Sequence, residues 1–340
     1  MQISVIGLSG SGKSALVGAM TGDPAGYAAK RSGDFVAVKV PDARVDRLSA
    51  AFRPKKTTYA EIRMREIPWS ASDPAARKSE AERYLARLKG SELFLHVVRG
   101  FESPAHEEPP DLGRDRTRMD EEMILSDLAA CEAILEREKK RREDMRRVEV
   151  LERCRRGLEE ERFLLSLGMA EQDAAKVRGY SFATLVPQLV VINAPAGTGP
   201  APADPHGRPH IVIDLGVAAE VAALPPGEQE EFAREMGLEH APLALLAREA
   251  YRAMDLVSFF TVGEDEVRAW TIAAGTVAQK AAGKIHTDLE RGFIRAEVVS
   301  TDTFFAHGSL HACKEKGVLR LEGKEYLVAD GDIMHVRFSV

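Results

Sequence analysis

The chain has little that would place it outside a reducing compartment or inside a membrane. Its 340 residues include 3 cysteines, Cys131, Cys154 and Cys313, and their spacing forms no zinc-ligand pattern. No apolar run approaches the roughly 20 residues that a membrane-spanning helix needs. The first apolar stretch covers only about five residues and lacks a basic start, which argues against a signal peptide. We therefore expect a cytoplasmic protein with free thiols and no membrane contact.

An excess of positive charge is also missing. The 47 Lys and Arg residues are outnumbered by 53 Asp and Glu residues, which gives a formal net charge of -6. This charge excludes a protein coated with basic residues, so any contact with nucleic acid has to be local. A hydrophobic fraction of 44% and a charged fraction of 29% are typical of a globular chain. The length is sufficient for two or three domains.

Short strand-like runs alternate with helical ones as far as residue 104, which is typical of an α/β domain with a largely parallel sheet. The stretch from residue 116 to 168 contains no proline, and its apolar residues Ile124, Leu128, Cys131 and Leu135 are spaced as in a coiled-coil seam. All residues from 136 to 147 except one are charged, which predicts the exposed tip of a helical hairpin. No Gly or Pro marks its turn.

The α/β pattern then resumes. The runs "PQLVVINA" and "PHIVIDLG" predict buried parallel strands, and two amphipathic helices follow them. After Asp255, alternating segments predict a small mixed or antiparallel sheet, with a hairpin turn at Asp330–Gly331 between "YLVA" and "IMHVRF". We expect four segments: a nucleotide-binding domain in two parts (1–115 and 185–256), a helical hairpin insertion (116–184) and a terminal domain (257–340).

The segment "GLSGSGKSA", residues 7 to 15, has the Walker A spacing of a phosphate-binding loop. Its glycines let successive backbone N–H groups converge on phosphate oxygens at a helix N-terminus, where the helix dipole favours anions. Lys13 would reach the β- and γ-phosphates, and the Ser14 hydroxyl would bind magnesium. We assign nucleotide contact to the loop residues Gly7, Ser9, Gly10, Ser11, Gly12, Lys13, Ser14 and Ala15.

Nearly the whole chain resembles the Obg-like, YchF-type ATPases, a family of P-loop proteins in the translation-factor class. The resemblance is carried by "VPDARVDRLSAAFRPKK" (40–56), by "LHVVRGFE" (95–102), and most specifically by residues 259–299 and the final twenty residues. It implies a nucleotide-binding domain, an inserted helical hairpin and a C-terminal TGS-like β-grasp domain. It also implies ATP hydrolysis in preference to GTP hydrolysis, and association with ribosomes.

The chain departs from the family's third nucleotide motif, a strand that ends in Asp-x-Ala-Gly. Here Glu66 takes the Asp place, Pro68 the Ala place and Trp69 the Gly place. Glu66 shares strand parity with Ile62 and Met64, so its carboxylate can face a magnesium shell; alternatively it is a solvated charge at the strand end. Trp69 has a side chain where close approach of the backbone to a γ-phosphate needs glycine.

Two loop positions are read from the resemblance. Lys30 stands where the family's switch threonine closes over magnesium, and Ser32 either replaces that threonine or is an ordinary turn residue. His106 matches the loop histidine proposed to act in family members, where neutral imidazole would orient water or accept its proton. The competing interpretation is an exposed histidine without a role. His96 lies inside an apolar strand run, which favours a structural role.

The base-reading motif is reduced. The family's Asn-x-x-Glu becomes Asn193-Ala-Pro-Ala196, and the element that normally backs the base becomes Asp214-Leu215-Gly216. Asn193 would either meet a purine edge or cap the strand end. Because Ala196 can neither donate nor accept a hydrogen bond, we expect poor discrimination between ATP and GTP.

Basic residues gather in the segment "QKAAGKIHTDLERGFIR" (279–295) of an otherwise acidic chain. Such a cluster either grips an RNA backbone or is a solvated face. The charged run from residue 136 to 147, with net charge +3 from seven basic and four acidic residues, is a weaker candidate for RNA contact. The candidate RNA contacts are Lys280, Lys284, Arg291 and Arg295.

The sequence thus predicts a P-loop α/β domain with a helical insertion and a β-grasp tail, binding ATP or GTP with Mg²⁺ held by Ser14 and Glu66. The expected protein is a monomer that hydrolyses its nucleotide weakly and associates with ribosomes or RNA. Two alternatives stay open: a pseudo-NTPase scaffold that binds nucleotide or phosphate without turnover, and, with less support, a small-molecule kinase.

Overall fold

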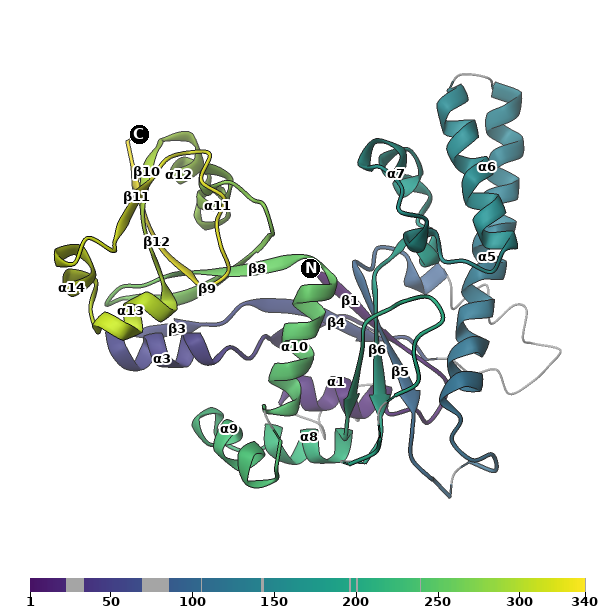
Figure 1. Ribbon diagram of the computed structural model, residues 1–340, viewed down its shortest axis with the longest axis horizontal. Helices are drawn as coiled ribbons and strands as arrows, with labels where there is room; N and C mark the ends of the chain where they lie inside the picture. Colours follow the sequence, from purple (N-terminus) through teal and green to yellow (C-terminus); the bar gives the residue numbers. More distant parts are fainter. Residues whose placement is uncertain are drawn as a thin grey trace. The chain divides into compact units, whose positions relative to one another are not determined.

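A computed structural model describes residues 1–22, 34–68, 86–104, 106–141, 144–195, 197–199, 201–238 and 240–339. The chain divides into two units, one formed by Met1–Val38 with Ile62–Ala253 and the other by Lys39–Glu61 with Met254–Val340. Each unit contains a six-stranded sheet (Figure 1). Within the described ranges, no helix has the length and apolar character needed to cross a bilayer.

The sheet of the first unit has the strand order β2-β4-β1-β5-β6-β7. Neighbouring strands from β4 to β7 run parallel, which confirms the expected α/β class and brings their carboxyl ends to one edge. The central strands β5 and β6 are buried at every residue, as the run "PQLVVINA" predicts for β6. The prediction of a buried strand from "PHIVIDLG" is wrong for β7, whose residues alternate between exposed and buried because it lies at the edge of the sheet. The strands are β1 (Gln2–Ile6), β2 (Val36–Lys39), β4 (Glu61–Glu66), β5 (Leu93–Arg99), β6 (Gln188–Asn193) and β7 (His210–Ile213).

Helices of the first unit fall into an α/β set and an inserted set. In the α/β set, α10 packs against β5, β6 and β7, and α1 packs against α8. That set comprises α1 (Lys13–Thr21), α8 (Leu215–Ala222), α9 (Pro226–Glu235) and α10 (Pro242–Ala253). The inserted set comprises α5 (Leu112–Arg141), α6 (Met145–Glu159) and α7 (Glu171–Val177), with short 3-10 turns at Leu164–Leu167, Arg178–Tyr180 and Ala183–Leu185.

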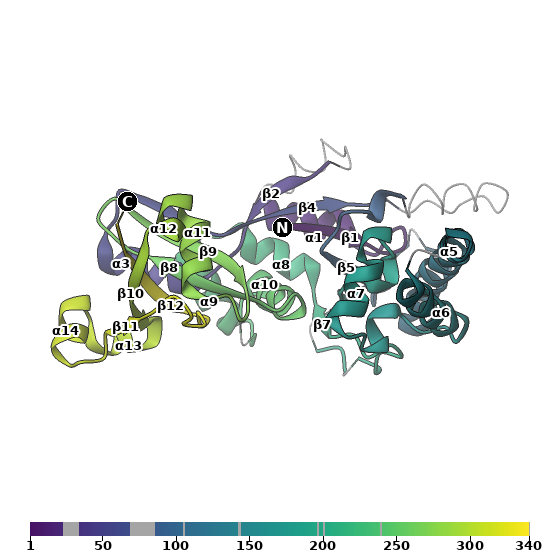
Figure 2. The ribbon, with the colours of Figure 1, turned by 90° about the horizontal axis from the view of Figure 1, so that it is seen from above.

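The insertion is a hairpin in which α5 and α6 lie side by side (Figures 1 and 2). The expected seam is buried: Ile124, Cys131 and Leu135 share a hydrophobic cluster with Leu151 and Leu158 of α6. Its turn falls between the end of α5 and the start of α6, within the charged run. The start of α6 is marked by a helix cap and not by Gly or Pro: the Asp144 side chain accepts a hydrogen bond from the Arg147 N–H.

The second unit is built on a mixed sheet with the order β11-β10-β12-β8-β9-β3. Helices α11 and α12 cover one of its faces through a shared core that includes Ala281, Phe293 and Met334. This sheet and its helices fit the expected β-grasp tail. The strands are β3 (Lys56–Thr58), β8 (Leu256–Thr261), β9 (Glu266–Ala273), β10 (Phe293–Ser300), β11 (Arg320–Glu322) and β12 (Asp332–Phe338). The helices are α3 (Ala43–Phe52), α11 (Ala278–Ile285), α12 (Thr287–Arg291), α13 (Thr301–His307) and α14 (Leu310–Glu315).

One segment falls in a different unit from the one that the sequence pattern indicates. Residues Lys39–Glu61, expected within the first part of the nucleotide-binding domain (1–115), cluster with the C-terminal residues. Strand β3 pairs in parallel with β9, and Arg44 donates a 2.6 Å hydrogen bond to Asp330. Three polar residues, Lys56–Thr58, give no apolar alternation, so a strand there has no sequence signal.

The predicted hairpin at Asp330–Gly331 is wrong. Strand β12 follows that turn but pairs antiparallel with β10 and parallel with β8. The turn is fixed by other contacts, since the Asp330 carboxylate accepts the Ser258 N–H and binds Arg44. The Asp332 carboxylate likewise accepts the Ala329 N–H. These tertiary bonds outweigh the local hairpin signal.

Candidate functional site

The phosphate loop joins β1 to α1 at the edge where the parallel strands end. Gly7, Gly10 and Gly12 all have positive φ, at +142°, +74° and +106°. A Cβ atom on Gly10 would overlap the His106 imidazole, and one on Gly12 would overlap the Asn193 amide nitrogen. Glycine is therefore required in this loop by the backbone conformation and, at Gly10 and Gly12, also by the neighbouring side chains of His106 and Asn193.

The start of α1 fits an anion. Its N-cap is Gly12, which offers no side-chain cap, and no acidic residue lies in the first turn. The Lys13 Nζ donates a 2.8 Å hydrogen bond to the Leu8 carbonyl oxygen, which curls the ammonium group back over the loop. Burial lowers the pKa of Lys13 to about 8, partly opposed by the negative charge of Glu66. A buried cation beside main-chain N–H groups is what a polyphosphate would neutralise.

Ser11 adds a second observation to the loop. Its hydroxyl is buried and has no hydrogen-bond partner in the part of the chain that the structure describes. Buried polar groups are normally paired, so this hydroxyl lacks a partner that a ligand at the loop could supply. Ser9 and Ala15 are exposed on the same loop, at its middle and its end. The donor set and the glycine geometry thus fit the phosphates of a nucleotide.

The two residues expected at magnesium lie in adjacent elements. Ser14 is half-buried in the first turn of α1, and Glu66 ends β4, where it pairs in register with Val5 of β1. Glu66 lies near enough to Lys13 to raise its pKa. A magnesium ion bound to phosphates commonly takes only one or two protein ligands, so Ser14 and Glu66 fit its needs in number and type. Among the described residues, no three His, Cys, Asp or Glu side chains gather as a metal site.

His106 lies against the phosphate loop. Its ring occupies the space over Gly10 that a side chain there would fill, and its backbone N–H donates to the Ser103 carbonyl oxygen at 3.0 Å. The loop that carries it follows β5 directly. The structure therefore brings the predicted catalytic histidine to the predicted phosphate site, although the two lie about a hundred residues apart.

Asn193 ends β6 and binds the protein with both ends of its amide. Its Nδ2 donates to the Ser11 carbonyl oxygen at 3.0 Å, and its Oδ1 accepts from the Leu215 N–H at 3.2 Å. Asp214 caps α8 by accepting the N–H groups of Gly216 and Val217. Asn193 thus ties the phosphate loop to the start of α8. Four other positions singled out in the sequence, Lys30, Ser32, Trp69 and Ala196, lie outside the described residues.

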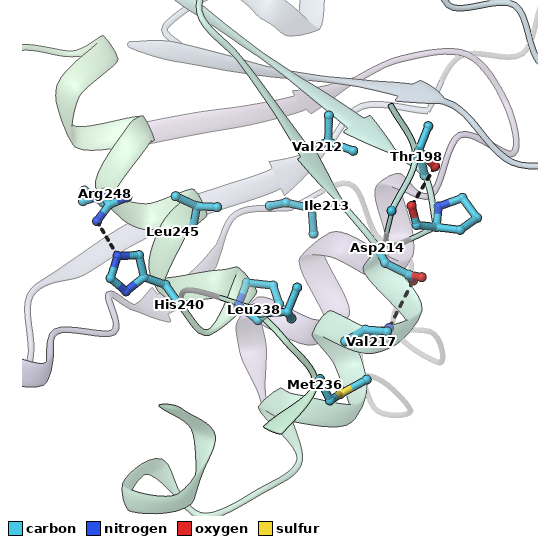
Figure 3. Close-up of a pocket in the computed structure, with 14 residues that line it drawn as sticks. Thr198, Val212, Ile213, Asp214, Val217, Met236, Leu238, His240, Leu245 and Arg248 are labelled. Atoms are coloured by element: carbon cyan, nitrogen blue, oxygen red, sulfur yellow. Dashed lines mark hydrogen bonds between the residues drawn. The ribbon is translucent and has the colours of Figure 1, made fainter. Parts of the chain in front are cut away.

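A pocket of about 270 Å³ lies beyond the carboxyl ends of β6 and β7 (Figure 3). Ala194 and Pro195, which follow Asn193, form part of its wall. Residues of β7, α8 and α10, and of the segment between α9 and α10, also line it. The walls are mostly apolar. At one end, Arg248 and His240 share a 3.1 Å hydrogen bond.

His96 has the structural surroundings that its place in an apolar run predicts. It is 1% exposed and lies beside a buried ionic network below α5, and burial holds its pKa well below the ordinary histidine value. In that network Arg208 donates to Asp120 at 2.6 and 2.7 Å and to Asp204 at 2.9 Å. These pairs join α5 to the segment before β7, so they anchor the insertion to the sheet.

The four residues assigned to RNA do not share one face. Lys280, Lys284 and Arg291 lie on α11 and α12, the helices that cover one face of the second sheet. Arg295 lies on β10 next to Ala296, which packs under those helices, so Arg295 points to the opposite face. Lys280 is also paired with Glu290 at 2.6 Å. The four residues are close in sequence but not on one face, because the chain passes from helix α12 into strand β10 at residue 293.

Sequence reasoning missed Arg99, which ends β5 and is only 5% exposed. It donates to the carbonyl oxygens of Phe101 and Glu108, one on each side of His106. The signal in the sequence was an arginine at the end of a mostly apolar strand run; it indicates that Arg99 has partners but not which ones, since arginines are almost never fully buried without partners.

The chain is a P-loop α/β protein, because β1, the phosphate loop and α1 follow one another where the parallel strands end. A family model named YchF-GTPase_C, described as a protein of unknown function (DUF933), matches residues 256–339. The "Ribosome-binding ATPase YchF" of Escherichia coli O157:H7 is 32% identical over 362 residues, covering 99% of this chain and 98% of that protein. The protein with the same name from Bacillus subtilis is 31% identical, with the same coverage. The chain belongs to the YchF family.

The fold agrees with this membership. The solved structure of the Schizosaccharomyces pombe YchF GTPase matches with a TM-score of 0.82, covering 99% of this chain and 97% of that one at 23% identity. A GTP-binding protein from Pyrococcus horikoshii OT3 matches with a TM-score of 0.55 at 15% identity, over the full length of both chains.

Proposed function

We propose that the chain binds the triphosphate of a purine nucleotide and hydrolyses it slowly with the help of magnesium. The observation that carries this proposal is the phosphate loop itself, with its buried Lys13, its uncapped helix start and glycines that tolerate no side chain. The relatives named as ribosome-binding ATPases support the same reaction.

Each residue has a role in this proposal. The N–H groups at the start of α1 and the Lys13 ammonium neutralise phosphate oxygens, and Ser14 and Glu66 hold the metal. Magnesium, when bound, would supply charge neutralisation at the phosphates. His106 faces the loop over Gly10, where its imidazole orients a water molecule or accepts its proton. Asn193 keeps the loop in register with α8 and has one amide hydrogen left for a base.

Phosphate release tests turnover. We expect the wild-type protein to release inorganic phosphate from ATP at a rate that Lys13→Ala reduces to background. Equal background in both proteins would reject hydrolysis. That outcome would support the alternative of a scaffold that binds nucleotide without turnover, which the departures at Glu66, Pro68 and Trp69 favour.

We also propose that the site separates ATP from GTP poorly. Both ends of the Asn193 amide are already bound to the protein, and Ala196 offers no second polar group. A site rejects an analogue strongly only when its own buried polar groups would be left unpaired. Parallel calorimetric titrations with ATP and GTP should give affinities within a hundredfold of each other, and a larger gap would contradict this.

The partner we propose is the ribosome, as the names of the relatives suggest. The second unit offers Lys284 and Arg291 on one face and Arg295 on the other. Co-sedimentation with ribosomes should weaken as salt rises, and charge reversal at Arg291 and Arg295 in turn should reveal which face makes contact. Binding that neither reversal changes would place the contact elsewhere.

A further inference from the structure

A buried guanidinium group, that of Arg99, binds the loop that carries His106 on both sides of the histidine. Arg99 donates from Nη1 to the Phe101 carbonyl oxygen at 3.2 Å and from Nη2 to the Glu108 carbonyl oxygen at 2.8 Å. These two acceptors lie on either side of His106 in the sequence. The planar guanidinium fork can hold both at fixed spacing, whereas a lysine ammonium group has no such planar fork.

Arg99 itself is rigidly placed. It is the last residue of β5, a strand buried between β1 and β6, and it pairs in register with Asn193. The next residue, Gly100, donates its N–H to the Asn193 carbonyl oxygen at 2.8 Å. The base of the loop is therefore fixed to the same strand end that holds the phosphate loop through the Asn193 side chain.

We propose that Arg99 is a positioning residue for His106, holding the loop from Phe101 to Glu108 so that the imidazole stays against Gly10. The proposal rests on the proposed function for its effect on turnover. A general acid or base contributes only when it is held within hydrogen-bond reach of the reacting water, so a loosened loop lowers the rate without removing the histidine.

The test compares the wild-type protein with Arg99→Met, Arg99→Lys, His106→Gln and the Arg99→Met/His106→Gln double variant. Arg118→Met, which removes an exposed arginine from α5, is the matched control. We expect Arg99→Met to lower kcat for ATP by at least about tenfold, and by no more than the roughly 10²–10⁴-fold that a positioned acid or base supplies, with KM unchanged within about threefold. Arg99→Lys should recover part of the loss, and Arg118→Met should behave as wild type.

Two results separate positioning from other roles. In the His106→Gln background, Arg99→Met should cause no further loss of kcat, because Arg99 acts through the histidine. Additive losses would overturn the proposal, and so would a large rise in KM, which would mean that Arg99 contacts the phosphates itself.

Hydrogen exchange of the nucleotide-free protein tests the loop without turnover. Backbone amides between residues 101 and 108 should exchange faster in Arg99→Met than in wild type, while amides of β5 and β6 keep their protection. Unchanged exchange in the loop would refute the positioning role. If wild-type turnover equals that of Lys13→Ala, the proposed hydrolysis fails, but this exchange measurement still decides the role of Arg99.

Discussion

Replacing Lys13 with methionine should stabilise the first unit while removing nucleotide binding. The Lys13 side chain is almost completely buried, with 5% of the residue exposed, and its Nζ donates to the Leu8 carbonyl oxygen. Burial lowers its pKa from 10.5 to about 8, so at neutral pH the nucleotide-free protein holds a charged ammonium group in an unfavourable place. Methionine is similar in length, has no charge and adapts to irregular space.

The expected gain follows from that pKa difference. A drop from 10.5 to about 8 corresponds to about 3 kcal/mol of destabilisation of the charged form. Losing the hydrogen bond to the Leu8 carbonyl oxygen costs about 1 kcal/mol of this gain. Lys13→Met should therefore stabilise the fold by about 2 kcal/mol at pH 7. Between pH 8 and 10.5 the folded wild type releases its proton while the unfolded chain keeps it. Wild-type stability therefore rises with pH in that window, and the gain from methionine shrinks.

Native-state hydrogen exchange of the β1 and β5 amides measures this stability in the first unit alone. The comparison is made at pH 7 and pH 9, after correction for intrinsic exchange rates, with the exposed Lys140 replaced by methionine as control. A less stable Lys13→Met protein at pH 7 would refute the reasoning. So would a gain that stays constant between the two pH values.

Three further outcomes follow from the same loop. The affinity for ATP should be constant up to pH 8 and then fall by up to about tenfold per pH unit, because binding requires the Lys13 proton; calorimetry should show no such fall in Lys13→Arg. Gly12→Ala should weaken ATP binding at least about tenfold, because a Cβ atom there overlaps the Asn193 amide and a φ of +106° costs about 1–3 kcal/mol in a non-glycine residue, so the loop shifts away from the conformation that binds phosphate; Gly199→Ala in open space should not weaken binding. Asn193→Ala should lower the unfolding free energy by about 2–4 kcal/mol and weaken ATP and GTP binding by the same factor in parallel titrations.

The sequence predicts those parts of the fold in which a pattern of apolar residues determines the structure. The apolar runs that became β1, β5 and β6 are buried strands, and the seam that includes Ile124 and Cys131 is buried in the hairpin. Strand β3 was not readable, because Lys56–Thr58 is polar and pairs with a strand some two hundred residues later. The turn at Asp330 misled for the same reason, since its carboxylate is committed to Ser258 and Arg44.

Some residues of the candidate site can likewise be predicted from the sequence and others cannot. The phosphate loop is a contiguous motif whose spacing follows from backbone geometry, so the amino-acid sequence alone predicts residues 7–15 as the phosphate site. Arg99 could not, because its role consists of two bonds to carbonyl oxygens, and any residue supplies a carbonyl. The same holds for Asn193, whose partners are the backbone atoms of Ser11 and Leu215.

Glycine is therefore needed in the loop for two separate reasons, which the sequence motif alone does not distinguish. Gly10 and Gly12 leave room for main-chain N–H groups to approach a phosphate, but the space beside them is already taken by His106 and Asn193. Both side chains come from loops or strand ends at the carboxyl edge of the sheet, and Arg99 and Gly100 connect the two. The geometry of the phosphate site is consequently set before a ligand arrives, and it is set by contacts that stabilise the loop in the nucleotide-free protein. The buried charge of Lys13 differs from these contacts, because its burial is unfavourable in the nucleotide-free protein and a bound phosphate would offset that cost.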